Sequence, residues 1–150
     1  MIRLGEITED NWLEAAKLTV SEAQKAFVAP SVGIIARGYV YRDCGGRVLT
    51  VLNGDEVVGL ALIREFTDEP LGYDLQQFMI GEAHQNKGCG SAALALVLDM
   101  LRAEGKYPTV EVCVKKADAA ALHVYEKAGF RDSGYVDPDC PDCVNLILEL

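Results

Sequence analysis

The segment from Gln85 to Ser91, Gln-Asn-Lys-Gly-Cys-Gly-Ser, carries residues suited to binding phosphate, and we call it the glycine loop. Gly88 and Gly90 let successive backbone N–H groups turn toward one point without a Cβ in the way. Helix-forming residues follow, so unpaired amides and the positive end of a helix dipole face the loop. Lys87 adds a charge. The segment predicts a pyrophosphate site, although a glycine turn can also simply join a strand to a helix.

Two other classes of phosphate loop do not fit this segment. A Walker loop needs Gly-Lys followed by Ser or Thr, whereas the order here is Lys-Gly-Cys-Gly. A dinucleotide fingerprint needs G-x-G-x-x-G after the first strand and an acidic residue about 20 positions later. The glycine loop has only two of those glycines and lies past the middle of the chain.

The chain has five cysteines, an odd number, and no secretory signal accompanies them. We therefore expect reduced thiols. Cys140 and Cys143 form a C-x-x-C, but no second pair or nearby His-x-x-x-His completes the four ligands of structural zinc. Metal binding is the lesser alternative. We expect no metal and a pair of free thiols in a turn.

The elements that must position the glycine loop are a strand before it and a helix after it. Residues 71–80 read as a strand, with Asp74, Gln76, Phe78 and Ile80 on one face and Leu75, Gln77 and Met79 on the other. Residues 91–103 read as a helix that ends at Gly105. This helix is apolar nearly all round, which predicts deep burial.

The remaining elements follow from hydrophobic periodicity and turn residues. Residues 2–7 predict a strand, and a helix begins near Thr8 with Trp12, Leu13, Ala16 and Val20 at helical spacing. Further helical pieces run from residue 21 to Pro30 and over 31–39. Strands at 47–52 and 56–64 form a hairpin. A strand at 109–114, a helix at 118–128 and strands at 130–136 and 144–150 complete a single α/β domain of residues 1–150.

The net charge of −9 disfavours nucleic acid as a partner, because phosphate binding calls for a basic face. An acidic field attracts cations, which favours a cationic partner. The simpler interpretation of the negative charge is that it keeps the protein soluble. No apolar run approaches the roughly 20 residues of a membrane-spanning helix. The first residues lack a signal-peptide core. We therefore expect a cytoplasmic protein without a membrane partner.

Two motifs resemble those of the GNAT superfamily of acyl-CoA-dependent N-acyltransferases. The pattern Q-x-x-G-x-G in the glycine loop, after a strand that ends Phe78-Met79-Ile80, resembles motif A. The segment 118–130, DAAALHVYEKAGF, resembles motif B, N-x-x-A-x-x-L-Y-x-K-x-G-F, with Asp118 in place of Asn. Both occur in the family's order and spacing. The resemblance implies a mixed, mostly antiparallel sheet of about seven strands flanked by about four helices.

Within that superfamily, several segments look like the polyamine (spermine/spermidine) acetyltransferase-like branch. They are Asn11-Trp12-Leu13, Gln24, Phe27-Val28 and the run 73–90. Two positions depart from that branch: Gly81 stands where Asp is common, and Gln77 where Arg is frequent.

The resemblance also implies which residues hold acetyl-CoA. The backbone of Phe78, Met79 and Ile80 would pair with the pantetheine arm as an added strand. The pyrophosphate would lie on the amides of Gln85, Asn86, Lys87, Gly88, Cys89, Gly90 and Ser91. Asp118 would stand beside the cofactor arm, where as a carboxylate it cannot donate a hydrogen bond. Cys89 is a variable position of such loops, so we expect no acyl-cysteine.

Tyr125 occupies the tyrosine position of motif B, which implies a general acid that protonates the departing sulfur. A core tyrosine is the alternative. Asp74 occupies the strand position where several members carry a catalytic Glu, so it is the candidate base. A solvated strand-end carboxylate is equally compatible with it. Weaker candidates are Glu82, Glu111 and Asp142, and we expect neither His84 nor His123 to be essential.

These patterns predict an N-acetyltransferase that moves an acetyl group directly from acetyl-CoA to a primary amine of a small cationic molecule, with polyamines leading. Bringing thioester and amine together supplies much of the rate. A backbone N–H near Ile80 could polarise the carbonyl. The alternatives are a non-catalytic acyl-CoA sensor and an acetyltransferase of protein N-termini or lysines. Exposed strands near the C-terminus suggest a homodimer.

Overall fold

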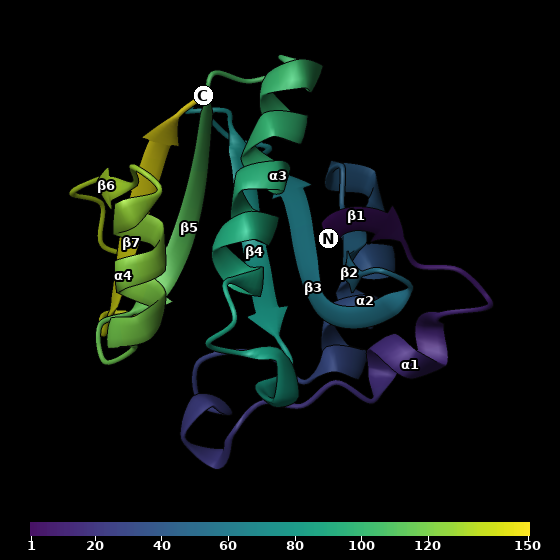
Figure 1. The fold of residues 1–150 in the computed structure, drawn as a ribbon. Coiled ribbons are helices and arrows are strands. Elements are labelled where there is room, and N and C mark those ends of the chain that lie inside the picture. The colour runs from purple at the N-terminus through teal and green to yellow at the C-terminus, as the bar shows by residue number, and fades with distance from the viewer.

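The computed structural model describes residues 1–150 as one seven-stranded sheet with helices on both faces (Figure 1). The strand order is β1-β2-β3-β4-β5-β7-β6, and only β4 and β5 run parallel. This confirms the predicted mixed, mostly antiparallel α/β fold. The strands are β1 (Ile2–Glu6), β2 (Arg47–Asn53), β3 (Glu56–Glu65), β4 (Tyr73–Ile80), β5 (Thr109–Lys115), β6 (Arg131–Asp132) and β7 (Cys143–Glu149).

Two apolar clusters hold the helices on opposite faces of the sheet. The helices are α1 (Trp12–Ala16), α2 (Ser31–Val40), α3 (Cys89–Glu104) and α4 (Ala119–Lys127). Leu94 and Val97 of α3 pack with Leu75 of β4 and Tyr125 of α4. Ala15 and Ile34, from α1 and α2, pack on the other face. Burying apolar area on both faces is the main stabilising contribution of such a layered arrangement.

A β-bulge changes the predicted faces of β4. Leu62 pairs with Gln77 and Ile63 with Leu75, so Gln76 has no partner on β3. The extra residue reverses the alternation of side chains along the strand. Leu75 and Phe78 therefore lie toward the same core cluster. The prediction that Asp74, Gln76 and Phe78 share one face is wrong.

The parallel pairing of β4 with β5 is short. It covers only Tyr73 with Val110 and Asp74 with Glu111. β5 continues to pair with β7 on its other side over its whole length. From Leu75 onward, the edge of β4 that faces β5 therefore has no strand partner, and the two strands diverge in the middle of the sheet.

The helices α3 and α1 differ from the predictions in their length and in their burial. α3 begins at Cys89, two residues early, and ends as predicted at Gly105, which has a φ of +62°. It buries one face only, since Ala92 and Ala95 are exposed, so the prediction of deep burial all round is wrong. The N-terminal helix is limited to α1, where Trp12 and Leu13 are exposed and Ala15 is buried. The prediction of an apolar stripe through Trp12 and Leu13 is therefore wrong.

Two further segments are shorter than predicted. The helical piece from residue 21 is a single 3₁₀ turn, η1 (Glu22–Gln24). The strand predicted at 130–136 is reduced to β6, which pairs only with Leu146 and Ile147 of β7. No helix of the chain is both long and apolar enough to cross a bilayer.

Candidate functional site

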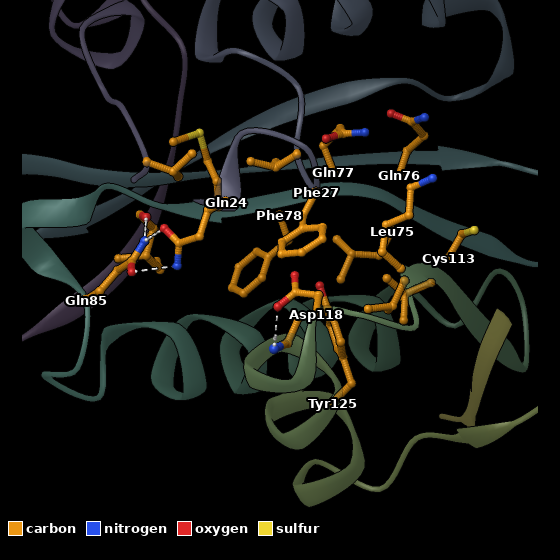
Figure 2. A pocket seen from close by; sticks show the side chains of 18 residues that line it. Gln24, Phe27, Leu75, Gln76, Gln77, Phe78, Gln85, Cys113, Asp118 and Tyr125 are labelled. Carbon is orange, nitrogen blue, oxygen red and sulfur yellow. Dashed lines mark hydrogen bonds between the residues drawn. The ribbon is translucent and has the colours of Figure 1, made fainter. Parts of the chain in front are cut away.

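The divergence of β4 and β5 opens a cavity of about 150 Å³ between them, which we call the β4–β5 cavity (Figure 2). Its walls come from β4, β5, α4 and the segment around η1. Twelve of its 18 lining residues are hydrophobic, but the surface that this slot exposes is mostly polar. Of the predicted residues, those that line it are Phe78, Met79, Ile80, Gln85, Asp118 and Tyr125.

One wall of this cavity was not predicted from the sequence. Val20, Gln24, Phe27 and Val28 lie around η1 and close the cavity on the side of β4. Side-chain amides brace this segment: the Ala29 N–H donates to Gln77 Oε1 at 3.0 Å. The sequence feature that pointed to this contact was the adjacent polar pair Gln76-Gln77 within β4.

Gln85 serves as a brace at the end of β4. Its Nε2 donates to the Ile80 carbonyl at 2.9 Å and to Gln24 Oε1 at 3.0 Å, and its Oε1 accepts from Gln24 Nε2. Its backbone N–H donates to the Glu82 carbonyl. The Ile80 carbonyl and the Gln85 amide, both predicted to contact the cofactor, thus already have partners within the protein.

The rest of the glycine loop keeps its donors free. The amides of Asn86 to Ser91 make no hydrogen bond within the protein, and no side chain caps the first turn of α3. Asn86 and Gly88 have positive φ values of 59° and 81°, which turn the backbone between β4 and α3. Lys87 Nζ rests on the Ala83 carbonyl at 3.0 Å, and the Cys89 side chain is buried. Free amides at a helix N-terminus can bind an anion.

Two side chains of the motif B segment face the cavity. Asp118 is the N-cap of α4, where its Oδ1 accepts the Ala121 N–H at 3.1 Å. Tyr125, two turns along the helix, packs against Phe78 and Phe130, with ring centroids 6.5 and 5.4 Å away. The same helix therefore presents a carboxylate and a phenol to the slot.

Burial raises the pKa of Tyr125, and the negative charge of Asp118 raises it further. The phenol therefore stays protonated at neutral pH. Because the ring is 6 % exposed and lines the cavity, its hydroxyl is a donor available to a group bound there. This arrangement suits a donor to a developing thiolate.

Asp74 does not line the cavity. It is 7 % exposed and accepts from Arg64 Nε on β3 at 2.8 Å, with Oδ2 as the acceptor. Burial raises its pKa, and the Arg64 guanidinium opposes that rise. Asp74 is thus a buried, ion-paired carboxylate at the last paired position of β4 and β5, and the alternative of a solvated carboxylate does not apply.

The weaker candidates lie outside the cavity. His123 and Glu82 are exposed, and His84 Nε2 is 3.6 Å from Glu56 Oε1. Asp142 forms an ion pair with Lys115 at 3.1 Å. Cys113, which the sequence did not single out, lines the cavity from β5. Partial burial and the charge of Asp137 raise its pKa, so it is a poor nucleophile at neutral pH.

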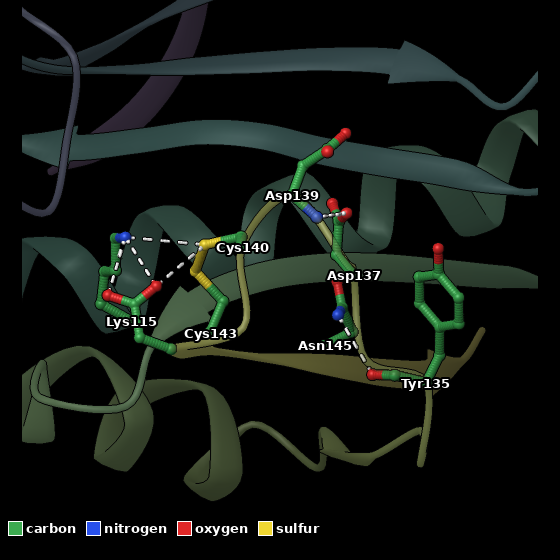
Figure 3. The surroundings of a disulfide bond; sticks show 8 residues. Lys115, Tyr135, Asp137, Asp139, Cys140, Cys143 and Asn145 are labelled. Carbon is green, nitrogen blue, oxygen red and sulfur yellow. Dashed lines mark hydrogen bonds and ion pairs between the residues drawn. A yellow bond between two sulfur atoms is a disulfide. The ribbon is translucent and has the colours of Figure 1, made fainter.

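The structure joins Cys140 and Cys143 by a disulfide bond (Figure 3). The expectation that both are free thiols is therefore wrong, because the turn brings their Cα atoms to 5.5 Å. Cys44, Cys89 and Cys113 are free.

Comparisons with known proteins place these features in a family. The model of the Acetyltransferase (GNAT) family matches residues 9–130, which include both motifs. At the level of sequence, no curated protein matches the chain.

Solved structures share the fold over nearly the whole chain. A GNAT acetyltransferase from Elizabethkingia anophelis, with acetyl-CoA bound, is 17% identical with a TM-score of 0.72 and covers 99% of this chain and 98% of its own. A Bacillus subtilis acetyltransferase in complex with CoA is 21% identical, with a TM-score of 0.70 and coverages of 99% and 97%. The Escherichia coli ribosomal-protein-S18-alanine N-acetyltransferase is 18% identical, with a TM-score of 0.71 and coverages of 99% and 94%.

Proposed function

The chain belongs to the GNAT acetyltransferase family, and on that premise we propose that it transfers an acetyl group directly from acetyl-CoA to a primary amine of a small molecule, with a polyamine as the leading acceptor. The observation that carries this proposal is the unpaired edge of β4 beside the β4–β5 cavity, which continues into the free amides of the glycine loop. A strand-like arm ending in an anion is the ligand that such a surface fits.

The residues present fit acetyl-CoA as the donor. The free edge of β4 around Phe78 and Met79 can pair with the amide groups of the pantetheine arm. The amides from Asn86 to Ser91 can hold the pyrophosphate, and Lys87 can leave the Ala83 carbonyl to add its charge. Gln85 keeps the strand end and the loop in register through its bonds to Ile80 and Gln24.

The acetyl transfer needs few catalytic side chains. The amine nitrogen forms a bond to the acetyl carbon, the carbon–sulfur bond breaks, and the amine loses a proton while the sulfur gains one. Tyr125 donates a hydrogen bond to the departing sulfur, since its hydroxyl lies in the cavity wall and stays protonated.

The charge distribution supports a cationic acceptor. The net charge is −9, and the carboxylates of Asp74 on β4 and of Asp137 and Asp142 before β7 lie near enough to Cys113 to raise its pKa, although Lys115 opposes them. Gln76 lines the cavity with a buried Oε1 that has no partner, so it could accept a hydrogen bond from an ammonium group. Polyamines carry several such groups, and an acidic field raises their local concentration.

The test is an acceptor screen with acetyl-CoA that measures release of free thiol. Spermidine and spermine should react fastest, aminoglycosides and simple primary amines more slowly. A preference for peptides with free N-termini or lysines would replace the small-molecule acceptor with a protein. Coenzyme A binding without turnover on any acceptor would indicate the sensor function. Calorimetry with acetyl-CoA and free CoA tests whether the protein binds the acetyl donor at all. Failure to bind either compound would contradict the whole proposal.

We also propose a homodimer through the outer edge of β7. β6 pairs only with Leu146 and Ile147 of that edge, and the Asn145 carbonyl and the Cys143 N–H bond to loop residues, so the free part of the edge is short and lies toward Glu149. Unpaired edges of this kind pair with another chain. Sedimentation equilibrium checks the mass of the particle, and a monomer at all concentrations would contradict the proposal.

A further inference from the structure

Three cysteines from two separate parts of the chain meet beside the β4–β5 cavity. Cys113 lies on β5, Cys140 in the turn before β7, and Cys143 begins β7. Their sulfur atoms all lie within 4.8 Å of one another. Cys143 pairs across the sheet with Lys115, two residues from Cys113, so these side chains share one face. We call this group the sulfur cluster.

The turn that carries two of these sulfurs is held by backbone hydrogen bonds. The Cys143 N–H donates to the Cys140 carbonyl at 3.1 Å, and the Cys140 N–H to the Asp137 carbonyl at 3.0 Å. The Lys116 N–H donates to the Asp142 carbonyl and ties the turn to the end of β5. The backbone of the turn is therefore held by hydrogen bonds as well as by the bond between Cys140 and Cys143.

We propose that the sulfur cluster, once that disulfide is reduced, binds a single zinc ion through three thiolates. Zinc–sulfur bonds of about 2.3 Å place two sulfurs of a tetrahedral site about 3.8 Å apart. The three sulfurs lie within 4.8 Å of one another, and reduction frees the Cys140 and Cys143 sulfurs from their covalent bond, so that they can separate to that distance. Sulfur donors select zinc over magnesium or calcium. A C-x₂-C turn with a third cysteine on the adjacent strand is a ligand set of the Cys₃ type.

The surroundings suit the charge of such a site. Three thiolates and one Zn²⁺ leave one net negative charge, and Lys115 Nζ lies 3.6 Å from Cys140 Sγ (Figure 3). The fourth position is open to the carboxylate of Asp142, whose Oδ1 is 3.6 Å from the same sulfur. Because Cys113 and Lys115 also line the cavity, the metal would alter the charge of its wall.

Reduction of the disulfide and binding of zinc each balance in atoms and charge, with a phosphine as the reductant. A phosphine and one water molecule convert the disulfide to two thiols and leave the phosphine oxide. Zinc then replaces three thiol protons, which are released to solvent. Binding therefore strengthens as the pH rises. The proposal does not depend on the acetyl acceptor.

The test uses the full chain, reduced with a phosphine and then freed of it, with Zn²⁺ for stoichiometry by elemental analysis and Co²⁺ for absorption. We expect one metal ion per chain and a thiolate-to-cobalt charge-transfer band of three-sulfur intensity. C113S should lose about a third of that intensity. It should also bind zinc at least about tenfold more weakly, because mutations of residues that only contact the metal ligands already lower metal affinity by this factor. C44S is the matched control, because Cys44 is a free cysteine outside the cluster.

Circular dichroism and urea unfolding of each variant check the fold independently of metal. The proposal is overturned if the reduced chain takes up no stoichiometric metal while its two thiols simply re-form the disulfide in air. It is also overturned if C113S matches the wild type in cobalt absorption and zinc affinity, or if C44S loses both.

Discussion

At the residue scale, Tyr125 combines two properties that decide its chemistry. Its ring is buried among Phe78 and Phe130, while its hydroxyl reaches the cavity that we assign to the thioester. Since burial raises its pKa, full proton loss is unfavourable. In the proposed reaction, the phenol would therefore contribute most as a hydrogen-bond donor to the sulfur as negative charge develops there.

Replacing Tyr125 by Phe should lower kcat by about 100-fold, within the range for general acids. Coenzyme A affinity should change little, because the ring and its packing remain. The measurement is thiol release under saturating acetyl-CoA and acceptor, with calorimetry of CoA on the same sample. An unaltered kcat would remove the hydroxyl from the mechanism.

Asp74 gives a prediction about stability with a definite sign. Because burial raises its pKa, the folded state binds the proton more tightly than the unfolded state does. Its contribution to stability is therefore present at low pH and is lost as pH rises from about 3.9, the ordinary value, through the folded value. In Asp74→Asn this loss is absent, so the variant should gain stability relative to wild type as the pH rises. Urea unfolding between pH 4 and 8 measures it.

The opposite trend would mean that the Arg64 ion pair outweighs burial. The same variant tests Asp74 as the base, a role that stays a prediction. Loss of kcat by about 100-fold, with the fold intact, would assign the carboxylate to proton transfer. Turnover close to wild type would leave it as a buried partner of Arg64 alone.

At the scale of elements, the two ends of α3 offer a matched pair of glycines. Gly88 precedes the helix with a φ of +81°, and Gly105 follows it with a φ of +62°. An added Cβ meets no atom closer than 3.8 Å at either position, so the cost of alanine is conformational and about 1–2 kcal/mol at each.

Gly88→Ala should also weaken coenzyme A binding by about tenfold, because a shift of the loop misdirects amides that bond to a charged group. Gly105→Ala should lower stability to a similar degree and leave that affinity unchanged. Calorimetry and urea unfolding on both variants make the comparison. Equal CoA affinities for the two variants would show that the loop amides do not hold the diphosphate.

At the scale of the whole molecule, the charge of −9 predicts how salt affects the acceptor. Salt screens an acidic field over about 10 Å at 0.1 M. The KM for spermidine should therefore rise about threefold or more between low salt and 0.3 M salt, and the KM for a monoamine should rise less. The KM for the anionic acetyl-CoA should not rise in parallel. Steady-state kinetics at matched pH measure all three, and identical salt responses would contradict steering by charge.

Features that depend on interactions between residues close in sequence were predicted better than features that depend on distant residues. The hairpin of β2 and β3, the C-terminal end of α3 at Gly105 and the glycine loop were predicted well, since glycine conformation and periodicity act within a few residues. The helix over Trp12 and Leu13 was predicted too long, because propensity yields to packing once only Ala15 finds a place against the sheet.

By itself, the sequence determined the order of elements, the free amides of the glycine loop and the positions of Asp118 and Tyr125 in their motif. These depend on local backbone chemistry. Tertiary structure alone decided that β4 and β5 diverge after two pairs, that Gln76 forms a bulge, and that Asp74 is paired with Arg64 outside the cavity. It also brought together the wall around η1 and the three sulfurs of Cys113, Cys140 and Cys143. Strand register and the contacts between distant segments set these features, and no local pattern of residues encodes them.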